Sequence, residues 1–321
     1  MITQPLDFEK HIFELEKRIS DLQHLSSVGE IDTADEVEKL QARVKKLLTE
    51  TFSRLTPWQI AQLSRHPDRP HTQDYFSLIF EDFIELHGDR CFRDDPSIVG
   101  GMAVLGGRSC VVIGHQKGRT TKENIQRNFG MPHPEGYRKA MRLMELAERF
   151  KKPLITFIDT PGAFPGIDAE ERGQAEAIAR SISTMTSLAA PIIVIIIGEG
   201  GSGGALALAV GDRVLMMEHA TYSVISPEGC ASILWRDGDR AEKAASLLKM
   251  TAQEIIQSPG IIDEIVKEPL GGAHRDYDRA AKLLKDVLLK HVKELDGIPV
   301  EELLKIRFER YRKIGPFAEK K

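Results

Sequence analysis

The sequence predicts an α/β protein whose strands are mostly parallel and buried on both faces. Short runs rich in valine and isoleucine alternate with stretches in which apolar residues recur at helical spacing, the pattern of strand–helix–strand units. The apolar runs are continuous, as expected for strands covered by helices on both sides. With 321 residues, 41% of them hydrophobic and 29% charged, the chain is long enough for one large domain with accessory segments.

The first fifty residues predict a helical hairpin. Apolar residues at alternating three- and four-residue spacing form one seam over 8–22 and another over 37–47, and a break at 26–30 separates them. Two short seams joined by a turn would run antiparallel. Such a hairpin either packs on its own domain or docks a second subunit, and the sequence leaves both interpretations open.

From about residue 74 onward, strands and helices are expected in alternation. Their order follows directly from the apolar runs and the glycine turns between them. The predicted strands are 98–105, 110–114, 154–158, 191–197, 214–217 and 222–225. The predicted helices are 136–150, 170–188, one that opens at 202 and runs to 210, 241–250, and a charged helical stretch from 279 to the end.

Composition excludes several classes of protein. The net charge is −4, so no overall positive field would attract nucleic acid or an anionic membrane. The three cysteines are scattered, which suits neither a disulfide framework nor a zinc site, and the ten histidines lack metal-ligand spacing, so no metal is expected. The N-terminus lacks the pattern of a signal peptide, and the longest apolar run is too short to span a bilayer. We therefore expect a soluble, cytoplasmic protein.

The glycine-rich segment 198–205 is the strongest candidate for a chemical site. It follows a predicted buried strand and opens a small apolar helix, and it holds five glycines in seven residues. Glycine lets the backbone approach a ligand closely, and the first turn of a helix leaves its N–H groups unpaired beside the positive end of the helix dipole. These features favour an oxyanion hole or a phosphate cradle. The alternative is that the glycines serve only close packing of helix and strand.

Two regular patterns match this segment weakly. Gly198, Gly200 and Gly203 fit the dinucleotide fingerprint, but several strands precede them, whereas that fingerprint usually follows the first strand. Gly200, Ser202 and Gly204 fit the nucleophile elbow of serine hydrolases. Asp212 with His219 or His274 could complete a triad, but nothing in the sequence singles them out.

Two further segments follow predicted strands. Residues 159–166 resemble the Asp-x-x-Gly switch of GTPases, but the sequence has no phosphate-binding loop to accompany it, so this interpretation fails. Residues 115–122 are basic and include Lys117, Arg119 and Lys122. They form either a solvated loop or a contact for phosphates or for an acidic partner.

Seven motifs occur in an order that identifies a family. Together they resemble the α subunits of the carboxyltransferase component of bacterial acetyl-CoA carboxylases, and the resemblance runs through nearly the whole chain. One departure is Phe164, where tyrosine is expected, which keeps the ring and loses a hydroxyl. The motifs are 114–119 (GHQKGR), 128–132 (NFGMP), 134–140 (PEGYRKA), 158–163 (IDTPGA), 198–205 (GEGGSGGA), 222–231 (YSVISPEGCA) and 268–275 (EPLGGAHR).

The resemblance implies a crotonase-like fold of ββα units in an α2β2 enzyme that carries a carboxyl group from carboxybiotin to acetyl-CoA, giving malonyl-CoA for fatty acid synthesis. Biotin would be attached to a biotin carboxyl carrier protein, biotin carboxylase would be a further partner, and the β subunit would carry zinc and most of the acetyl-CoA pocket. The expected parts of this chain are an assembly hairpin (1–50), the carboxyltransferase domain (51–296) and a helical tail (297–321).

The resemblance also assigns roles to the glycine segments. The backbone N–H groups of Gly203 and Gly204 would polarise the ureido oxygen of biotin, on which negative charge develops as the carboxyl group leaves. The released biotin can then accept the acetyl proton, so no side chain need act as the base. Residues expected to line the pocket are Gly200, Gly201, Ser202, Ala205, Gly162, Ala163 and Phe164.

Overall fold

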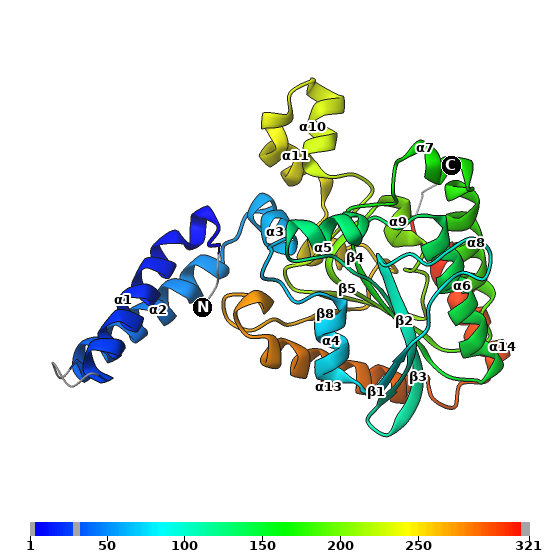
Figure 1. The fold of residues 1–321 in the computed structure, drawn as a ribbon, viewed down its shortest axis with the longest axis horizontal. Helices are drawn as coiled ribbons and strands as arrows, with labels where there is room; N and C mark the ends of the chain where they lie inside the picture. Colours follow the sequence, from blue (N-terminus) through cyan, green and yellow to red (C-terminus); the bar gives the residue numbers. More distant parts are fainter. Residues whose placement is uncertain (1–3, 28–32, 316–321) are drawn as a thin grey trace, which may run out of the picture.

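One twisted sheet organises the chain in the computed structural model, which describes residues 4–27 and 33–315 (Figure 1). Within these residues eight strands pair in the order β1-β2-β3-β4-β5-β6-β8, with β7 beside the end of β5. The first three strands are antiparallel and the remaining pairs are parallel, which confirms the predicted α/β class. The strands are β1 (Glu81–Glu85), β2 (Ile98–Leu105), β3 (Arg108–His115), β4 (Leu154–Thr160), β5 (Ile192–Gly201), β6 (Arg213–Met217), β7 (Thr221–Ser223) and β8 (Glu264–Val266).

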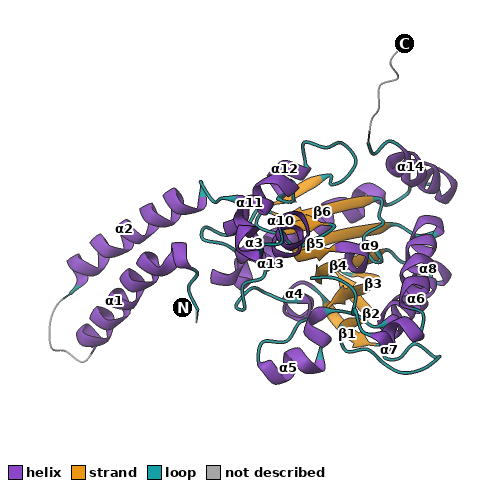
Figure 2. Ribbon diagram, turned by 90° about the horizontal axis from the view of Figure 1, so that it is seen from above, coloured by secondary structure: helices purple, strands orange, loops and turns teal. Residues whose placement is uncertain are grey.

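Helices cover both faces of the sheet. Helix α6 (Pro134–Arg149) packs on β2, β3 and α8 (Gln174–Ser187), while α4 (Thr72–Ile79) and α13 (Tyr277–Leu295) lie on the opposite face (Figures 1 and 2). Strand β4 is buried along its whole length, as expected for a strand covered on both sides. The remaining helices are α3 (Pro57–Ser64), α5 (Thr121–Gln126), α7 (Ile167–Glu171), α9 (Ser202–Leu206), α10 (Pro227–Trp235), α11 (Ala241–Leu248), α12 (Ala252–Ile255) and α14 (Val300–Arg312).

Several predicted boundaries were wrong, and glycine explains two of them. The helix expected over 170–188 is divided into α7 and α8 by Gly173, whose φ of 84° lies in the left-handed region. The C-terminal helical stretch is likewise divided by Gly297, with φ of 84°, between α13 and α14. Strand β5 runs on to Gly201 because β7 pairs with it there, and α9 then ends at Leu206, short of the expected residue 210.

The predicted N-terminal hairpin is present as α1 (Lys10–Ser27) and α2 (Ala34–Phe52), which project from the body of the molecule (Figure 1). Residues 28–32, which join the two helices, lie outside the described residues. The hairpin has a small apolar core of its own, separate from the core around the sheet. That core consists of Ile12, Ile19, Val44 and Leu48.

The C-terminal helix α14 packs against the body of the protein. Arg307 is fully buried there and pairs with Asp212, with 2.7 Å between Arg307 Nη2 and Asp212 Oδ2. Its guanidinium also donates to the carbonyl groups of Met185, Leu188 and Ala190. No helix within the described residues is both long enough and apolar enough to cross a membrane.

Candidate functional site

The two glycine-rich segments meet at one edge of the sheet. Strands β4 and β5 are parallel neighbours, so their carboxyl ends lie side by side, and Thr160 pairs with Gly200 there. In open α/β sheets, ligands characteristically bind at this end of the strands. The loop after β4 carries Gly162 to Phe164, and α9 begins directly after β5.

The chain turns sharply from β5 into α9 at Ser202. Its φ of 55° is left-handed, an uncommon conformation for a residue with a side chain. Ser202, Gly203 and Gly204 form the first turn of α9, so their N–H groups are those that a helix cannot pair internally. The predicted group of free amides therefore lies at the junction of strand and helix.

Close packing explains most of the glycines, but not Gly203. A Cβ on Gly204 would lie 2.5 Å from the backbone nitrogen of Ala163, so the loop after β4 requires glycine at this position. The backbone or side chains of neighbouring residues exclude a Cβ at Gly198, Gly200 and Gly201 as well. At Gly203 the nearest atom would be Ile178 Cγ2, at 3.8 Å, so a side chain would fit. Packing thus accounts for four of these five glycines but not for Gly203, so close packing is not the whole explanation of the segment.

An apolar cavity of about 340 Å³ adjoins this turn. Among the described residues that line it there is no histidine, aspartate or glutamate to activate the Ser202 hydroxyl, and the lysine of the lining, Lys249, pairs with Glu254 at 3.3 Å. The possible triad partners are engaged elsewhere, since Asp212 pairs with Arg307, His219 with Glu268 and His274 with Glu9. The lining residues are Ser202, Gly203, Leu206, Tyr222, Ser223, Val224, Leu248, Lys249, Ile255 and Ile261.

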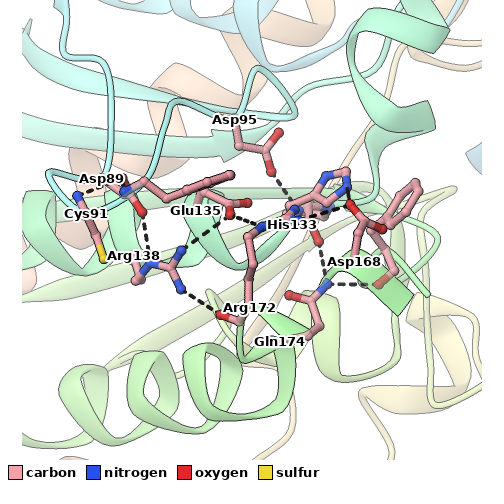
Figure 3. A network of polar contacts seen from close by, with 12 residues as sticks. Asp89, Cys91, Asp95, His133, Glu135, Arg138, Asp168, Arg172 and Gln174 are labelled. Atoms are coloured by element: carbon pink, nitrogen blue, oxygen red, sulfur yellow. Dashed lines mark hydrogen bonds and ion pairs between the residues drawn. The ribbon is translucent and has the colours of Figure 1, made fainter. Parts of the chain in front are cut away.

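A buried polar network holds the loop after β4 (Figure 3). The ring of Phe164 stacks on His133, with 4.1 Å between ring centroids, and the Gln174 side chain donates to the Phe164 carbonyl at 3.0 Å. The backbone N–H of His133 donates in turn to Asp95 at 2.7 Å. The loop that packs against Gly204 is therefore fixed by His133 directly before α6, by Gln174 at the start of α8 and, through His133, by Asp95 before β2.

The basic segment after β3 is less available than the sequence indicated. Lys117 Nζ lies 2.7 Å from Asp159 Oδ1 and 2.6 Å from Glu199 Oε2, and only 13% of its side chain is exposed. Arg119 pairs with Asp74 at 2.6 Å and covers the ring of Tyr277. Lys122 is exposed, so it has the freest access to an outside anion of the three predicted basic residues.

Electrostatics keep Lys117 and Asp159 ionised. Burial disfavours the charge on Lys117, but Asp159 and Glu199 outweigh it and raise the pKa of the ammonium above its ordinary value. Burial likewise opposes the charge on Asp159, but Lys117 outweighs it and holds the pKa of the carboxyl below its ordinary value. The three groups therefore behave as one ion cluster at the ends of β3, β4 and β5.

One group of side chains has the composition of a metal site but is already satisfied. Potential ligand atoms of Glu9, His66 and His274 all lie within 4.8 Å of one another. His66 is engaged at both ring nitrogens, by the Gln4 carbonyl at 2.8 Å and the Asp68 N–H at 3.0 Å. The Arg275 guanidinium also lies 3.1 Å from the Glu9 carboxylate, so a cation there would be redundant. This group joins the hairpin to the body of the protein.

A sequence model of the family described as "Acetyl co-enzyme A carboxylase carboxyltransferase-like" matches residues 5–315. The chain belongs to this carboxyltransferase family. It is 58% identical over 314 residues to the acetyl-coenzyme A carboxylase carboxyl transferase subunit alpha of Methylococcus capsulatus, covering 98% of both chains. The corresponding subunit of Thermus thermophilus is also 58% identical, with 98% of this chain and 99% of that one covered. These relatives confirm the predicted function, that of a carboxyltransferase α subunit.

Solved structures confirm the crotonase-like fold. Transcarboxylase 12S superposes with a TM-score of 0.53 at 19% identity, over 67% of this chain and 41% of that chain. A Pseudomonas malonate decarboxylase hetero-tetramer in complex with coenzyme A gives a TM-score of 0.53 at 18% identity, over 68% of this chain and 88% of that one. The geometry of the strand ends thus belongs to a fold shared by carboxyltransferases.

The two glycine segments expected from the sequence do meet in the structure, but the sequence did not predict the charges beneath them. Asp159 and Glu199 were considered only as members of the segments 159–166 and 198–205. Lys117 was considered only as part of a solvated loop or as a contact for phosphates or an acidic partner. The signal that could have found them is positional, because charged residues at the carboxyl ends of adjacent parallel strands converge. The apolar cavity beside Gly203 gave no signal, since its walls come from segments up to about sixty residues apart in the chain.

Proposed function

We propose that the α9 turn of this carboxyltransferase α subunit binds the ureido oxygen of biotin while the carboxyl group passes from carboxybiotin to acetyl-CoA. The N–H groups of Gly203 and Gly204 would donate to that oxygen. Ser202, Gly200, Gly201 and Ala205 would shape the turn around it. The loop carrying Gly162, Ala163 and Phe164 would form the opposite wall.

The observation that carries this proposal is the free first turn of α9 beside an apolar cavity. Donors fixed in a site that excludes water stabilise charge on an oxygen as that charge develops. Gly203 supports the assignment, because it lines the cavity and packing does not require glycine there. The cavity also suits a fused bicyclic ring of low polarity, such as the ring system of the biotin attached to a carrier protein.

The absence of a base from the described lining of the cavity fits the same chemistry. Transfer of a carboxyl group to the acetyl methyl group requires that a proton leave it. If the biotin nitrogen freed by the transfer accepts that proton, the protein need supply only hydrogen-bond donors and a dry, shaped cavity. The side chain of Ser202 then has no chemical task.

The partners follow from the same proposal. We infer an α2β2 assembly in which the β subunit binds zinc and most of the acetyl-CoA, so that the active site is completed between the two chains. The biotin carboxyl carrier protein would deliver carboxybiotin made by biotin carboxylase, in the cytoplasm. Residues 1–50 would serve assembly, 51–296 the transfer, and 297–321 would form the C-terminal tail. Lys122 is the better placed of the three basic residues to meet a phosphate or an acidic partner.

Reconstitution tests the proposal. The α chain purified alone should be folded, by circular dichroism, but should not decarboxylate malonyl-CoA in the presence of free biotin, because it holds half of the site. Addition of the β subunit should restore turnover. Decarboxylation by the α chain alone, at the rate of the complex, would overturn the proposal.

A further inference from the structure

We infer that Lys117 is a positioning residue for the transfer reaction, which holds the ends of β4 and β5 in the register that the α9 turn requires. The inference rests on the proposed function of that turn. Lys117 does not touch the bound substrates in this account. It acts through Asp159 and Glu199, which lie at the start of the segments 159–166 and 198–205.

Three contacts build the link. Lys117 Nζ bridges Asp159 Oδ1 at 2.7 Å and Glu199 Oε2 at 2.6 Å. The same Asp159 oxygen accepts the backbone N–H of Glu199 at 3.0 Å. One ammonium group therefore fixes both the side chain and the backbone of the residue that precedes Gly200.

The surrounding packing leaves this arrangement little freedom. A Cβ on Gly130 would lie 2.7 Å from Lys117 Cγ, so the lysine stem is confined by the segment after α5. A Cβ on Gly198 would collide with the Asp159 carboxylate. The register between β4 and β5 shifts between Ile158 and Thr160, at the position of Asp159. The ion cluster therefore occupies the irregular point of the sheet from which both site loops emerge.

Removal of the ammonium would leave two carboxylates facing each other. Like charges at this separation cannot both stay ionised in a buried site without displacement. At high pH they would repel and move Glu199, and with it the α9 turn. At lower pH one carboxyl group would take up a proton and donate it as a hydrogen bond to the other, which restores the contact. The loss of activity should therefore depend on pH.

Other titratable and charged groups near the cluster are neutral in this pH range or already paired. His66, which lines the same cavity as Lys117, is held at both ring nitrogens by the Gln4 carbonyl and the Asp68 N–H. His71 and His115 lie beside it, and burial lowers the pKa of each to about 4, so both stay neutral above pH 6. Burial raises the pKa of Tyr75 above its ordinary value, and Arg119 is always charged. Arg69 and Glu268 form a closed pair, with 2.5 Å between Arg69 Nη2 and Glu268 Oε1.

The test is the pH profile of Lys117→Met in the reconstituted αβ complex, with malonyl-CoA and free biotin. At pH 8 we expect kcat to fall by on the order of 10²-fold, comparable to the loss of one oxyanion donor, while KM for malonyl-CoA changes little. Between pH 8 and pH 6 the ratio of variant to wild-type kcat should rise at least about tenfold. The double variant Lys117→Met with Glu199→Gln removes the repulsion and should recover most of kcat at pH 8.

A matched control is Arg307→Met, which breaks a buried ion pair near the opposite end of β5. It should lower the melting temperature without changing the pH profile of kcat. The inference is overturned if Lys117→Met loses the same factor at pH 6 and pH 8, or if Arg307→Met reproduces its profile. If Lys117→Met does not fold, the double variant alone decides. A double variant whose kcat at pH 8 is on the order of 10²-fold below that of the wild type would overturn the inference. If the reconstituted wild-type complex shows no turnover, the proposed function is refuted instead.

Discussion

At the scale of single residues, Ser202 separates two chemistries. Its left-handed backbone at a strand–helix turn has the geometry of a nucleophile elbow, but its side chain has no base beside it in the described part of the chain. Ser202→Ala should therefore keep most of the decarboxylation activity of the reconstituted complex. Both residues carry a Cβ, so the strain of the turn is nearly unchanged. An inactive but folded Ser202→Ala would revive the hydrolase interpretation.

Two buried histidines should make stability depend on pH. Burial lowers the pKa of His71 and of His115 to about 4, below the unfolded value near 6.5. The unfolded chain then binds more protons, so stability is complete above pH 6.5 and is lost as the pH falls toward 4. Each histidine should cost about 2 kcal/mol between pH 7 and pH 5.

Urea denaturation of His71→Gln at pH 7 and pH 5 checks this expectation. The variant should lose less free energy of unfolding than the wild type over this interval, by about 2 kcal/mol. His87→Gln is a suitable control, because His87 is exposed on the surface. Equal losses for wild type and His71→Gln would contradict the assignment of a buried neutral imidazole.

The ion cluster under the candidate site could not be predicted from the sequence. Lys117, Asp159 and Glu199 are separated by 42 and 40 positions, and their pairing depends on strand order, which periodicity does not specify. Local rules therefore predicted a basic loop and two strand ends, but not their mutual neutralisation. The family resemblance added the expected role of the Gly203 and Gly204 amides. The spacing of the glycines alone could not have distinguished that role from close packing.

At the scale of elements, the strands of the core were predicted well because continuous apolar runs report burial on both faces. The predicted strand 98–105 coincides with β2. Errors arose where tertiary pairing overrode local pattern: β5 continues through glycines because β7 lies beside it. Short elements such as α3, α5 and β8 carried too few periodic residues to be recognised.

The hairpin of α1 and α2 offers a test at this scale. It has its own core and meets the body at Glu9, which lies 3.0 Å from His274, and at Phe52, which packs edge-on against His219. Deletion of residues 1–50 should weaken formation of the α2β2 complex, measured by sedimentation velocity, more than it lowers the melting temperature of the α chain. The uncomplexed truncated chain serves as the control for folding. A truncated chain that still assembles fully would favour the alternative, a hairpin that only packs on its own domain.

At the scale of the whole molecule, the sheet brings the two glycine-rich loops of the candidate site to one edge. The body supplies rigid strand ends, a buried ion cluster beneath them and a polar network that fixes the loop after β4 (Figure 3). In the proposed function, the groups that act on biotin are backbone amides held by distant side chains. That proposal would explain why the candidate site has few recognisable catalytic side chains.

The most direct test of the central claim removes the N–H group of Gly203 and compares the result with a variant that keeps it. Gly203→Ala and Gly203→Pro both add a Cβ, for which there is room, but only proline deletes the N–H group. Ser202 precedes the substitution in a left-handed conformation, so the folding of both variants must be checked. Their melting temperatures provide this check. In the reconstituted complex, Gly203→Ala should retain most of kcat for malonyl-CoA decarboxylation, whereas folded Gly203→Pro should lose about 10²–10³-fold. Equal activity of the two folded variants would contradict the assignment of this amide to the oxyanion site.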